Sequence, residues 1–215
     1  MAGTLELTGI VPVYKPKGIT SHDVIDILRK RTGVRRIGHA GTLDPLASGV
    51  LVIGIGREAT KKLHLEVAKE KEYLAEVTLG VTSSTDDAEG EKQSHKISHP
   101  PTLPEVSMAV AQFKGDVTQV PPIFSAAKLK GEAAYKLARK GKVVELKPRN
   151  VEIKNIQVLD YSWPKLTIKV VTGPGVYIRS LARDIGEVLG TGGYVSELER
   201  IRVGEFTVED AVKLN

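Results

Sequence analysis

An aspartate in a glycine-rich loop is the residue of this sequence best placed to do chemistry. Asp44 follows Gly38 and Gly41 and precedes the apolar residues 50–56, and glycines let a backbone approach a ligand closely. A carboxylate at such a place can act as a nucleophile or as a general base. The Asp44–Pro45 pair taken alone is also typical of an ordinary turn, so the dipeptide does not decide between the two.

The composition removes several other chemistries. The chain contains no cysteine, which excludes disulfides, thiolate zinc sites, iron–sulfur clusters and a cysteine nucleophile. No second carboxylate and no Ser/His pairing stands out beside Asp44, as a hydrolase would need. An unrelated hydrolase that uses Asp44 as a base is therefore a weak alternative.

The charge balance suits a polyanionic partner. The formal net charge is +5, and each Lys or Arg near a phosphate gains affinity by releasing counterions. Five cations lie within residues 29–36, where they either complement the C-terminus of a helix or contact RNA. The sequence shows no leader pattern and no run of roughly 20 apolar residues, so we expect a protein that is neither exported nor held in a membrane.

Regular elements are predicted on both sides of the Asp44 loop. Thr20 or Ser21 can cap a helix that runs through Val24 and Leu28, and residues 50–56 have the length of a buried strand. We also expect helices over residues 59–70, 105–113, 131–140 and 178–189, and strands over 73–79, 151–154 and 166–170. Residues 82–104 are rich in Thr, Ser, Asp, Gly, His and Pro and are expected to form a long mobile surface loop.

The loop around Asp44 resembles a known signature. Residues 38–51, Gly-His-Ala-Gly-Thr-Leu-Asp-Pro-Leu-Ala-Ser-Gly-Val-Leu, resemble nearly residue for residue the signature loop of TruB-type tRNA pseudouridine synthases. Four further segments match that family and occur in its order: residues 15–22, 71–73, 121–126 and 175–179.

This resemblance implies a fold and a reaction. The fold is α/β (α+β), with a mixed, largely antiparallel sheet, flanking helices and a central active-site cleft, in one catalytic domain over residues 1–215. The PUA-type domain that usually follows in full-length members is expected to be absent. The reaction converts uridine to pseudouridine in the T-loop of tRNA, at position 55, after the base is flipped out. The resemblance implies no metal and no organic cofactor.

The resemblance also assigns roles to particular residues. Asp44 matches the essential catalytic aspartate, and Arg179 the arginine that pairs with it. Tyr73 matches the tyrosine that lies against the target base, and His39 the histidine that displaces the target from its stack. Tyr177 and Leu198 are expected to line the substrate pocket. Without the family, these residues would be interpreted as packing or surface groups, and whether Asp44 acts as nucleophile or base stays open.

The expected partner is tRNA, recognised mainly by its shape. The basic residues 29–36 and 128–142 are candidates for contacts with its backbone, and we expect a cytoplasmic monomer that needs no protein partner. One alternative is a non-catalytic RNA-binding protein that keeps the fold. Another is the related guide-RNA-dependent synthase of archaea and eukaryotes, which works inside a larger ribonucleoprotein.

Overall fold

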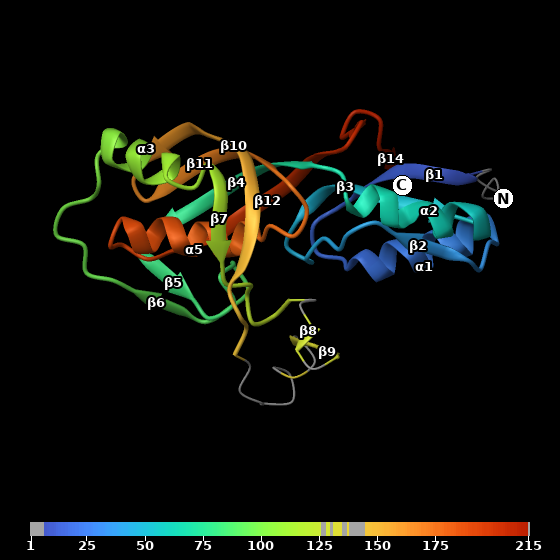
Figure 1. Cartoon of the computed structure of the whole chain (residues 1–215), viewed down its shortest axis with the longest axis horizontal. Helices are drawn as coiled ribbons and strands as arrows, with labels where there is room; N and C mark the ends of the chain where they lie inside the picture. Colours follow the sequence, from blue (N-terminus) through green and yellow to red (C-terminus); the bar gives the residue numbers. More distant parts are fainter. Residues whose placement is uncertain (1–6, 126–127, 130, 135–136, 138–144, 215) are drawn as a thin grey trace. The chain divides into compact units, whose positions relative to one another are not determined.

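The computed structural model describes residues 7–125, 128–129, 131–134, 137 and 145–214 (Figure 1). The described chain gathers in two compact units: the first runs up to Leu74 and resumes at Leu198, and the second is Ala75–Glu197. Strands β4 (Lys71–Leu79) and β12 (Gly193–Val203) each contribute residues to both units. The prediction that residues 1–215 act as one catalytic domain stays a prediction.

The first unit is built around strand β3 (Ser48–Ile55). Strands β1 (Gly9–Lys15) and β2 (Ile37–His39) run antiparallel to β3, whereas β12 runs parallel to it. Short strands β13 (Phe206–Thr207) and β14 (Val212–Lys213) pair with β12 and β1 respectively. Every residue of β3 after the first is buried, as expected of a strand that is covered on both faces.

Two helices pack against the strands of this unit (Figure 1). Helix α1 (Ser21–Thr32) contacts β2, and helix α2 (Arg57–Val67) contacts β1, β2 and β3. The predicted helix after Thr20 is confirmed: the Thr20 hydroxyl accepts from the Asp23 N–H at 3.0 Å, and the Asp23 carboxylate accepts from the Thr20 N–H at 2.8 Å. This reciprocal capping box fixes where the chain enters α1 and leaves Ser21 for another contact.

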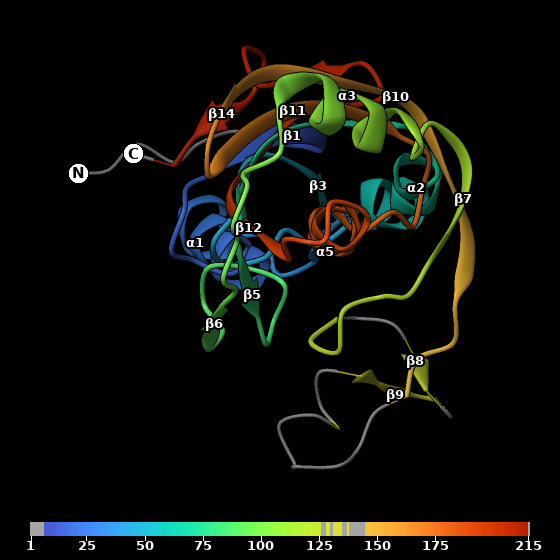
Figure 2. The ribbon, with the colours of Figure 1, turned by 90° about the vertical axis from the view of Figure 1, so that its left-hand side faces the viewer.

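The second unit carries a strongly curved antiparallel arrangement of strands. β10 (Arg149–Ser162) pairs antiparallel with both β11 (Lys165–Thr172) and β7 (Gly115–Gln119). Helix α3 (Leu103–Ala111) packs against β10 and against helix α5 (Ile178–Val188), and Figure 2 shows both helices on the inner side of β10. The predicted helical stripe of α5 is confirmed for Ile178, Leu181, Ala182 and Ile185, which are buried, while Val188 is exposed.

The predicted loop over residues 82–104 contains more regular structure than expected. Strands β5 (Val81–Ser83) and β6 (Lys92–Ser94) form a hairpin, and Asp87 makes a parallel bridge with Val195. Alternation of apolar residues is too brief in this segment to reveal its strands, and the hydrogen bonds of its polar side chains take the place of apolar burial. The expected mobility of this segment stays untested.

The predicted helix over residues 131–140 is corrected where the structure describes it. Strand β9 (Glu132–Ala133) pairs with β8 (Lys128–Leu129), so the chain is extended at the expected start of that helix. Ala134 and Leu137 are helical, and the rest of the segment lies outside the described residues. The composition of the segment favours a helix, but Gly131 has a φ of +89°, which allows a tight hairpin between β8 and β9.

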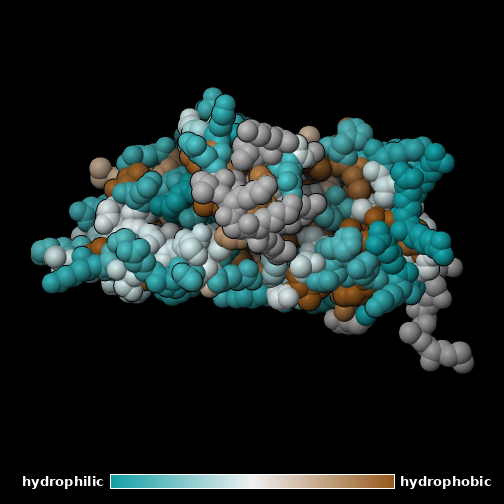
Figure 3. Space-filling model, turned by 90° about the horizontal axis from the view of Figure 1, so that it is seen from below, coloured by the Kyte–Doolittle hydropathy of each residue, from teal (hydrophilic) through white to brown (hydrophobic). Residues whose placement is uncertain are grey.

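The predicted fold class is confirmed. Antiparallel pairs predominate, the β3–β12 and β1–β14 pairs are parallel, and helices flank the strands of each unit. None of the described helices is both long enough and apolar enough to cross a membrane. Figure 3 shows hydrophilic residues over much of the visible face, with apolar residues scattered among them.

Candidate active site

Asp44 lies in the connection between β2 and β3 and is half-buried. Its carbonyl accepts from the N–H of Ala47 at 3.0 Å, which closes a turn over Pro45 and Leu46. The predicted turn and the predicted functional loop are therefore the same segment. We call residues Gly41 to Val50 the Asp44 loop.

The turn that precedes α1 and the first residue of α1 hold the Asp44 loop on both sides of the aspartate. The Ser21 hydroxyl accepts from the Leu43 N–H and donates to the Leu43 carbonyl, both at 2.9 Å. The carbonyl of Pro45 accepts from the Gly18 N–H at 2.8 Å and from the fully buried ammonium group of Lys15 at 3.4 Å. The residues on either side of Asp44 are thus fixed by side chains and backbone from the matching segment 15–22.

Strand β12 holds the far end of the loop. Gly49 lies opposite Arg200 in the parallel pairing, and its φ is +105°, a conformation that favours glycine. A Cβ atom at Gly49 would lie 2.2 Å from the Arg200 carbonyl oxygen. The glycine at this position of the signature is therefore required by the close approach of β12.

His39 ends β2, immediately before the loop, opposite Ile53 of β3. Burial lowers the pKa of His39, and the positive charges of Arg200 and His22 lower it further. Its Nδ1 atom is buried and finds no hydrogen-bond partner among the described residues. The imidazole is consequently neutral at neutral pH.

Tyr73 and Leu198 belong to the same unit as Asp44 and are both nearly buried, with 7% and 8% of their surface exposed. Two residues before Tyr73 lies Lys71, which donates to the carbonyls of Val67 at 2.8 Å and Lys69 at 2.6 Å. Burial, and then the nearby Arg200 guanidinium, lowers the pKa of Lys71 to about 8. Lys71 lies in the family-matching segment 71–73, but no role was predicted for it from the sequence.

The remaining predicted residues, Tyr177 and Arg179, lie at the start of α5 in the second unit. The backbone N–H of Tyr177 donates to the Gln119 side chain at 2.8 Å, and the Gln119 amide donates back to its carbonyl at 3.1 Å. The side-chain amide of Gln119 thus holds the residue before α5 on both of its backbone groups.

Arg179 has an acidic partner that the sequence analysis missed. Its guanidinium donates to Asp87 Oδ2 at 3.1 Å, to the Thr85 carbonyl at 3.2 Å and to the Phe124 carbonyl at 2.9 Å. The Arg179 and Asp87 side chains are only 5% and 4% exposed, so the charge of each is compensated by the other. The predicted pairing of Arg179 with Asp44 joins residues of different units and stays a prediction.

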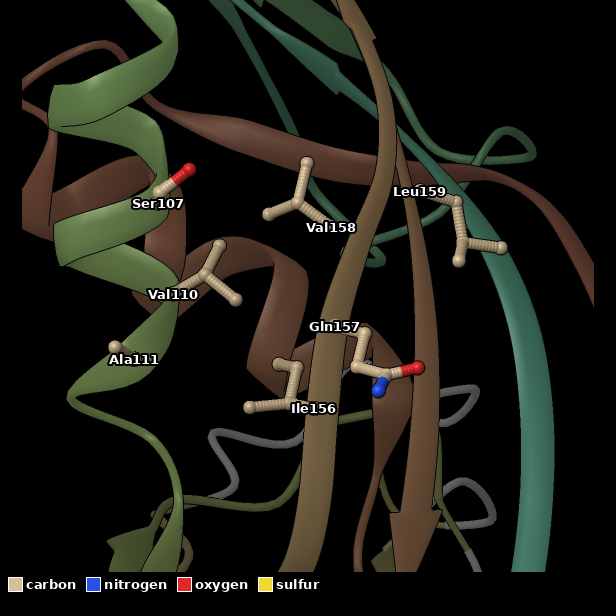
Figure 4. Close-up of a pocket in the computed structure, with 7 residues that line it drawn as sticks. All are labelled: Ser107, Val110, Ala111, Ile156, Gln157, Val158 and Leu159. Carbon is tan, nitrogen blue, oxygen red and sulfur yellow. The ribbon is translucent and has the colours of Figure 1, made fainter.

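A shallow groove between α3 and β10 lies apart from the predicted residues of its unit. Ser107, Val110 and Ala111 of α3 face Ile156 and Val158 of β10 across it (Figure 4). Its lining contains no titratable side chain. Among the described residues, no cluster of three His, Asp or Glu side chains is arranged to hold a metal ion.

Two solved structures are similar to this chain in their fold. A chain in the crystal structure of a Cbf5-Nop10-Gar1 complex is 28% identical with a TM-score of 0.74, and the match covers 96% of this chain but 52% of that one. A crystal structure of a pseudouridylate synthase is 17% identical with a TM-score of 0.51 over 98% of this chain and 70% of that one. This chain thus spans about half the length of the chain it matches in that complex, and it has the fold of a pseudouridylate synthase.

Sequence comparison gives the family. Residues 29–178 match the family model described as TruB family pseudouridylate synthase, N-terminal domain, and residues 179–215 match that of the tRNA pseudouridylate synthase B C-terminal domain. The tRNA pseudouridine synthase B of Mycobacterium sp. (strain KMS) is 46% identical over 96% of this chain and 71% of the relative. That of Clostridium tetani is 42% identical over 97% of this chain and 72% of the relative. This chain belongs to the TruB family of pseudouridylate synthases.

Proposed function

We propose that this protein isomerises uridine to pseudouridine in tRNA, at position 55 of the T-loop, with Asp44 as the catalytic carboxylate. The observation that carries the proposal is the support of the Asp44 loop. Ser21 holds Leu43, and Lys15 and Gly18 hold Pro45, so the residues before and after the aspartate are both fixed. A catalytic group must be held in its productive geometry, whereas a turn that only connects two strands needs no such support.

The reaction conserves every atom of the uridine except for the exchange of protons. The bond between C1′ and N1 breaks, the base rotates, and C1′ joins C5, which gives up its proton while N1 gains one. No oxidant, reductant or energy source is needed. Asp44 serves either as a nucleophile toward the nucleoside or as the base that removes a sugar proton, and both roles require its ionised form.

The other predicted residues act on the base and its surroundings. Tyr73 is proposed to stack on the uracil and to help move a proton, and Leu198 and Tyr177 to line the pocket. His39, held neutral by burial, is suited to replace a base in the RNA stack, because a neutral ring carries little desolvation cost. Arg179 is proposed to interact with the Asp44 carboxylate while Asp87 holds its guanidinium.

Extrusion of the uridine costs roughly a few kcal/mol, and contacts between the base and the pocket must recover that free energy. Arg29, Lys30 and Arg31 lie in the last turn of α1, and with Arg35 and Arg36 they are proposed to contact the tRNA backbone. The proposed backbone contacts over residues 128–142 lie largely outside the described residues. We further propose that the enzyme works in the cytoplasm as a monomer without a protein partner, unlike the similar chain of the Cbf5-Nop10-Gar1 complex.

The test uses an unmodified tRNA transcript labelled with tritium at C5 of uridine, with no added metal or cofactor. Bond formation at C5 releases the label, and sequencing after chemical derivatisation locates the product. We expect wild type to convert the T-loop uridine and Asp44→Asn to convert none. Asp160→Asn, which changes an exposed carboxylate of β10, is the matched control and should keep full activity.

Each alternative function gives a different result in this assay. Tight tRNA binding without tritium release from wild type would favour a non-catalytic RNA-binding protein. Conversion only in the presence of a guide RNA and protein partners would favour the guide-dependent class. Full activity of Asp44→Asn would remove Asp44 from the chemistry.

A further inference from the structure

The residue that ties the Asp44 loop together is Arg200 of β12. Its side chain is 1% exposed, although arginine is rarely buried unless it is paired. Nε donates to the Val50 carbonyl at 2.7 Å, and Nη2 donates to the Gly41 carbonyl at 3.1 Å. Across the described residues, no carboxylate forms an ion pair with Arg200.

The two carbonyl partners of Arg200 lie at opposite ends of the Asp44 loop. Gly41 begins the loop, and Val50, the third residue of β3, ends it. The guanidinium fork therefore closes the loop with two hydrogen bonds, and the planar geometry of the group fixes their directions. The backbone of Arg200 is fixed as well, because Gly49 packs directly on its carbonyl oxygen.

The positive charge of Arg200 disfavours the protonated forms of two neighbouring side chains. The Arg200 charge contributes to lowering the pKa values of both His39 and Lys71, and a Cβ at Gly41 would lie 3.9 Å from Lys71 Cε and 3.7 Å from Arg200 Nη1. Two cations thus lie next to the start of the loop. The guanidinium holds both carbonyls at once, through Nε and Nη2, and this is the simplest reason for an arginine at this position despite that repulsion.

We propose that Arg200 is a positioning residue for catalysis, which clamps the two ends of the Asp44 loop and so sets the place of the Asp44 carboxylate against the bound uridine. This inference rests on the proposed function. It predicts that loss of the clamp slows the chemical step and leaves tRNA affinity unchanged, since the Arg200 side chain is buried and has almost no surface to offer to a bound RNA.

The test compares Arg200→Met, Arg200→Lys and Arg202→Met in single-turnover tritium release with enzyme in excess, beside tRNA binding and thermal unfolding of each variant. Arg202→Met is the matched control: Arg202 lies two residues further along β12, and its guanidinium pairs with Glu70 and Glu72 instead of the loop. A misplacement of about 1 Å costs roughly 100-fold in rate, so we expect Arg200→Met to be slower by about that factor. The control should stay within about 3-fold of wild type, a difference worth less than 1 kcal/mol in the barrier.

Arg200→Lys keeps the buried charge but has a single nitrogen in place of the two that donate to Val50 and Gly41, so its rate should fall between those of Arg200→Met and Arg202→Met, with an unchanged dissociation constant. That variant keeps the inference testable if Arg200→Met fails to fold. Wild-type rates in Arg200→Lys, a loss confined to tRNA binding, or an equal loss in Arg202→Met would each overturn the proposal. Failure of the wild-type chain to release tritium would instead overturn the proposed function itself.

Discussion

Arg179 and Asp87 form a buried ion pair, in which Nη1 lies 3.1 Å from Oδ2. The pair ties the first turn of α5 to the segment between β5 and β6. A second arginine of α5, Arg183, reaches the neighbouring Asp86 at 2.9 Å. The segment expected to be a mobile loop therefore supplies a counterion for each of two arginines of α5, one of which is the family-matching Arg179.

Replacement of Asp87 by Asn should remove the buried carboxylate that pairs with the Arg179 guanidinium. Breaking a buried pair in this way typically costs about 3–5 kcal/mol, which urea unfolding of the variant measures. Asp86→Asn is the matched control. Asp86 has a φ of 59°, which asparagine tolerates, and its partner Arg183 is 26% exposed. We expect the control to lose about 1 kcal/mol or less, and equal losses would show that the Arg179 pair has no special weight.

The buried Lys71 should make stability depend on alkaline pH. Its folded-state pKa of about 8 lies below the ordinary value of 10.5, so between those values the unfolded chain binds more protons and stability rises with pH. Relative to Lys71→Met, the unfolding free energy of wild type should therefore rise by up to about 3 kcal/mol across that window. Unfolding curves of both proteins at the two ends of the window measure the difference. Parallel pH profiles would mean that Lys71 keeps an ordinary pKa.

The pKa of His39 should lie below the ordinary value for histidine. Burial lowers its pKa from 6.5, and a histidine whose folded-state pKa is lowered destabilises the folded state as pH falls through the ordinary value. Titration of the imidazole signals by NMR, assigned with His39→Asn, should give a midpoint below 6.5. The stability difference between His39→Asn and wild type should shift in favour of the variant as the solution is acidified. A midpoint at or above the ordinary value would contradict the burial argument.

Gly49 should be the least replaceable glycine of the loop. Its alanine variant would place Cβ 2.2 Å from the Arg200 carbonyl oxygen, whereas Gly56 has a similar φ of +92° with nothing within 4 Å of the added atom. Gly56→Ala therefore measures the cost of the backbone conformation alone, about 1–3 kcal/mol. Gly49→Ala should lose a further 1–3 kcal/mol, roughly, from overpacking, and should also slow pseudouridine formation. Equal losses of stability in the two alanine variants would mean that the Arg200 backbone of β12 can move away from the added Cβ without cost.

Local signals in the sequence predicted the elements that position Asp44. The capping residue Thr20, the apolar spacing through Val24 and Leu28, and the buried run before Gly56 each depend on neighbours within one turn or one strand. The structure confirms these elements. The match to the signature loop directed attention to Asp44 itself, which the Asp-Pro dipeptide alone could not do.

The groups that hold the site were not predictable in the same way. Asp87 is one of 26 acidic residues, and nothing in its local spacing marks it as the partner of Arg179, 92 positions away. Arg200 reaches Val50 across 150 positions, and it lies on a strand whose pattern gives no sign of a buried cation. A buried arginine requires compensation, and this rule finds the partner only after the topology is known.

The anchors of the Asp44 loop determine which truncations of this chain can keep the loop in place. The anchors come from Lys15 to Ser21 on one side and from Arg200 on the other, so they lie near opposite ends of the sequence. A fragment that starts after Ser21 or stops before Arg200 would retain the aspartate together with most of the surrounding signature. It would nevertheless lack the groups that hold the loop, and motif content alone would overstate what such a fragment can do.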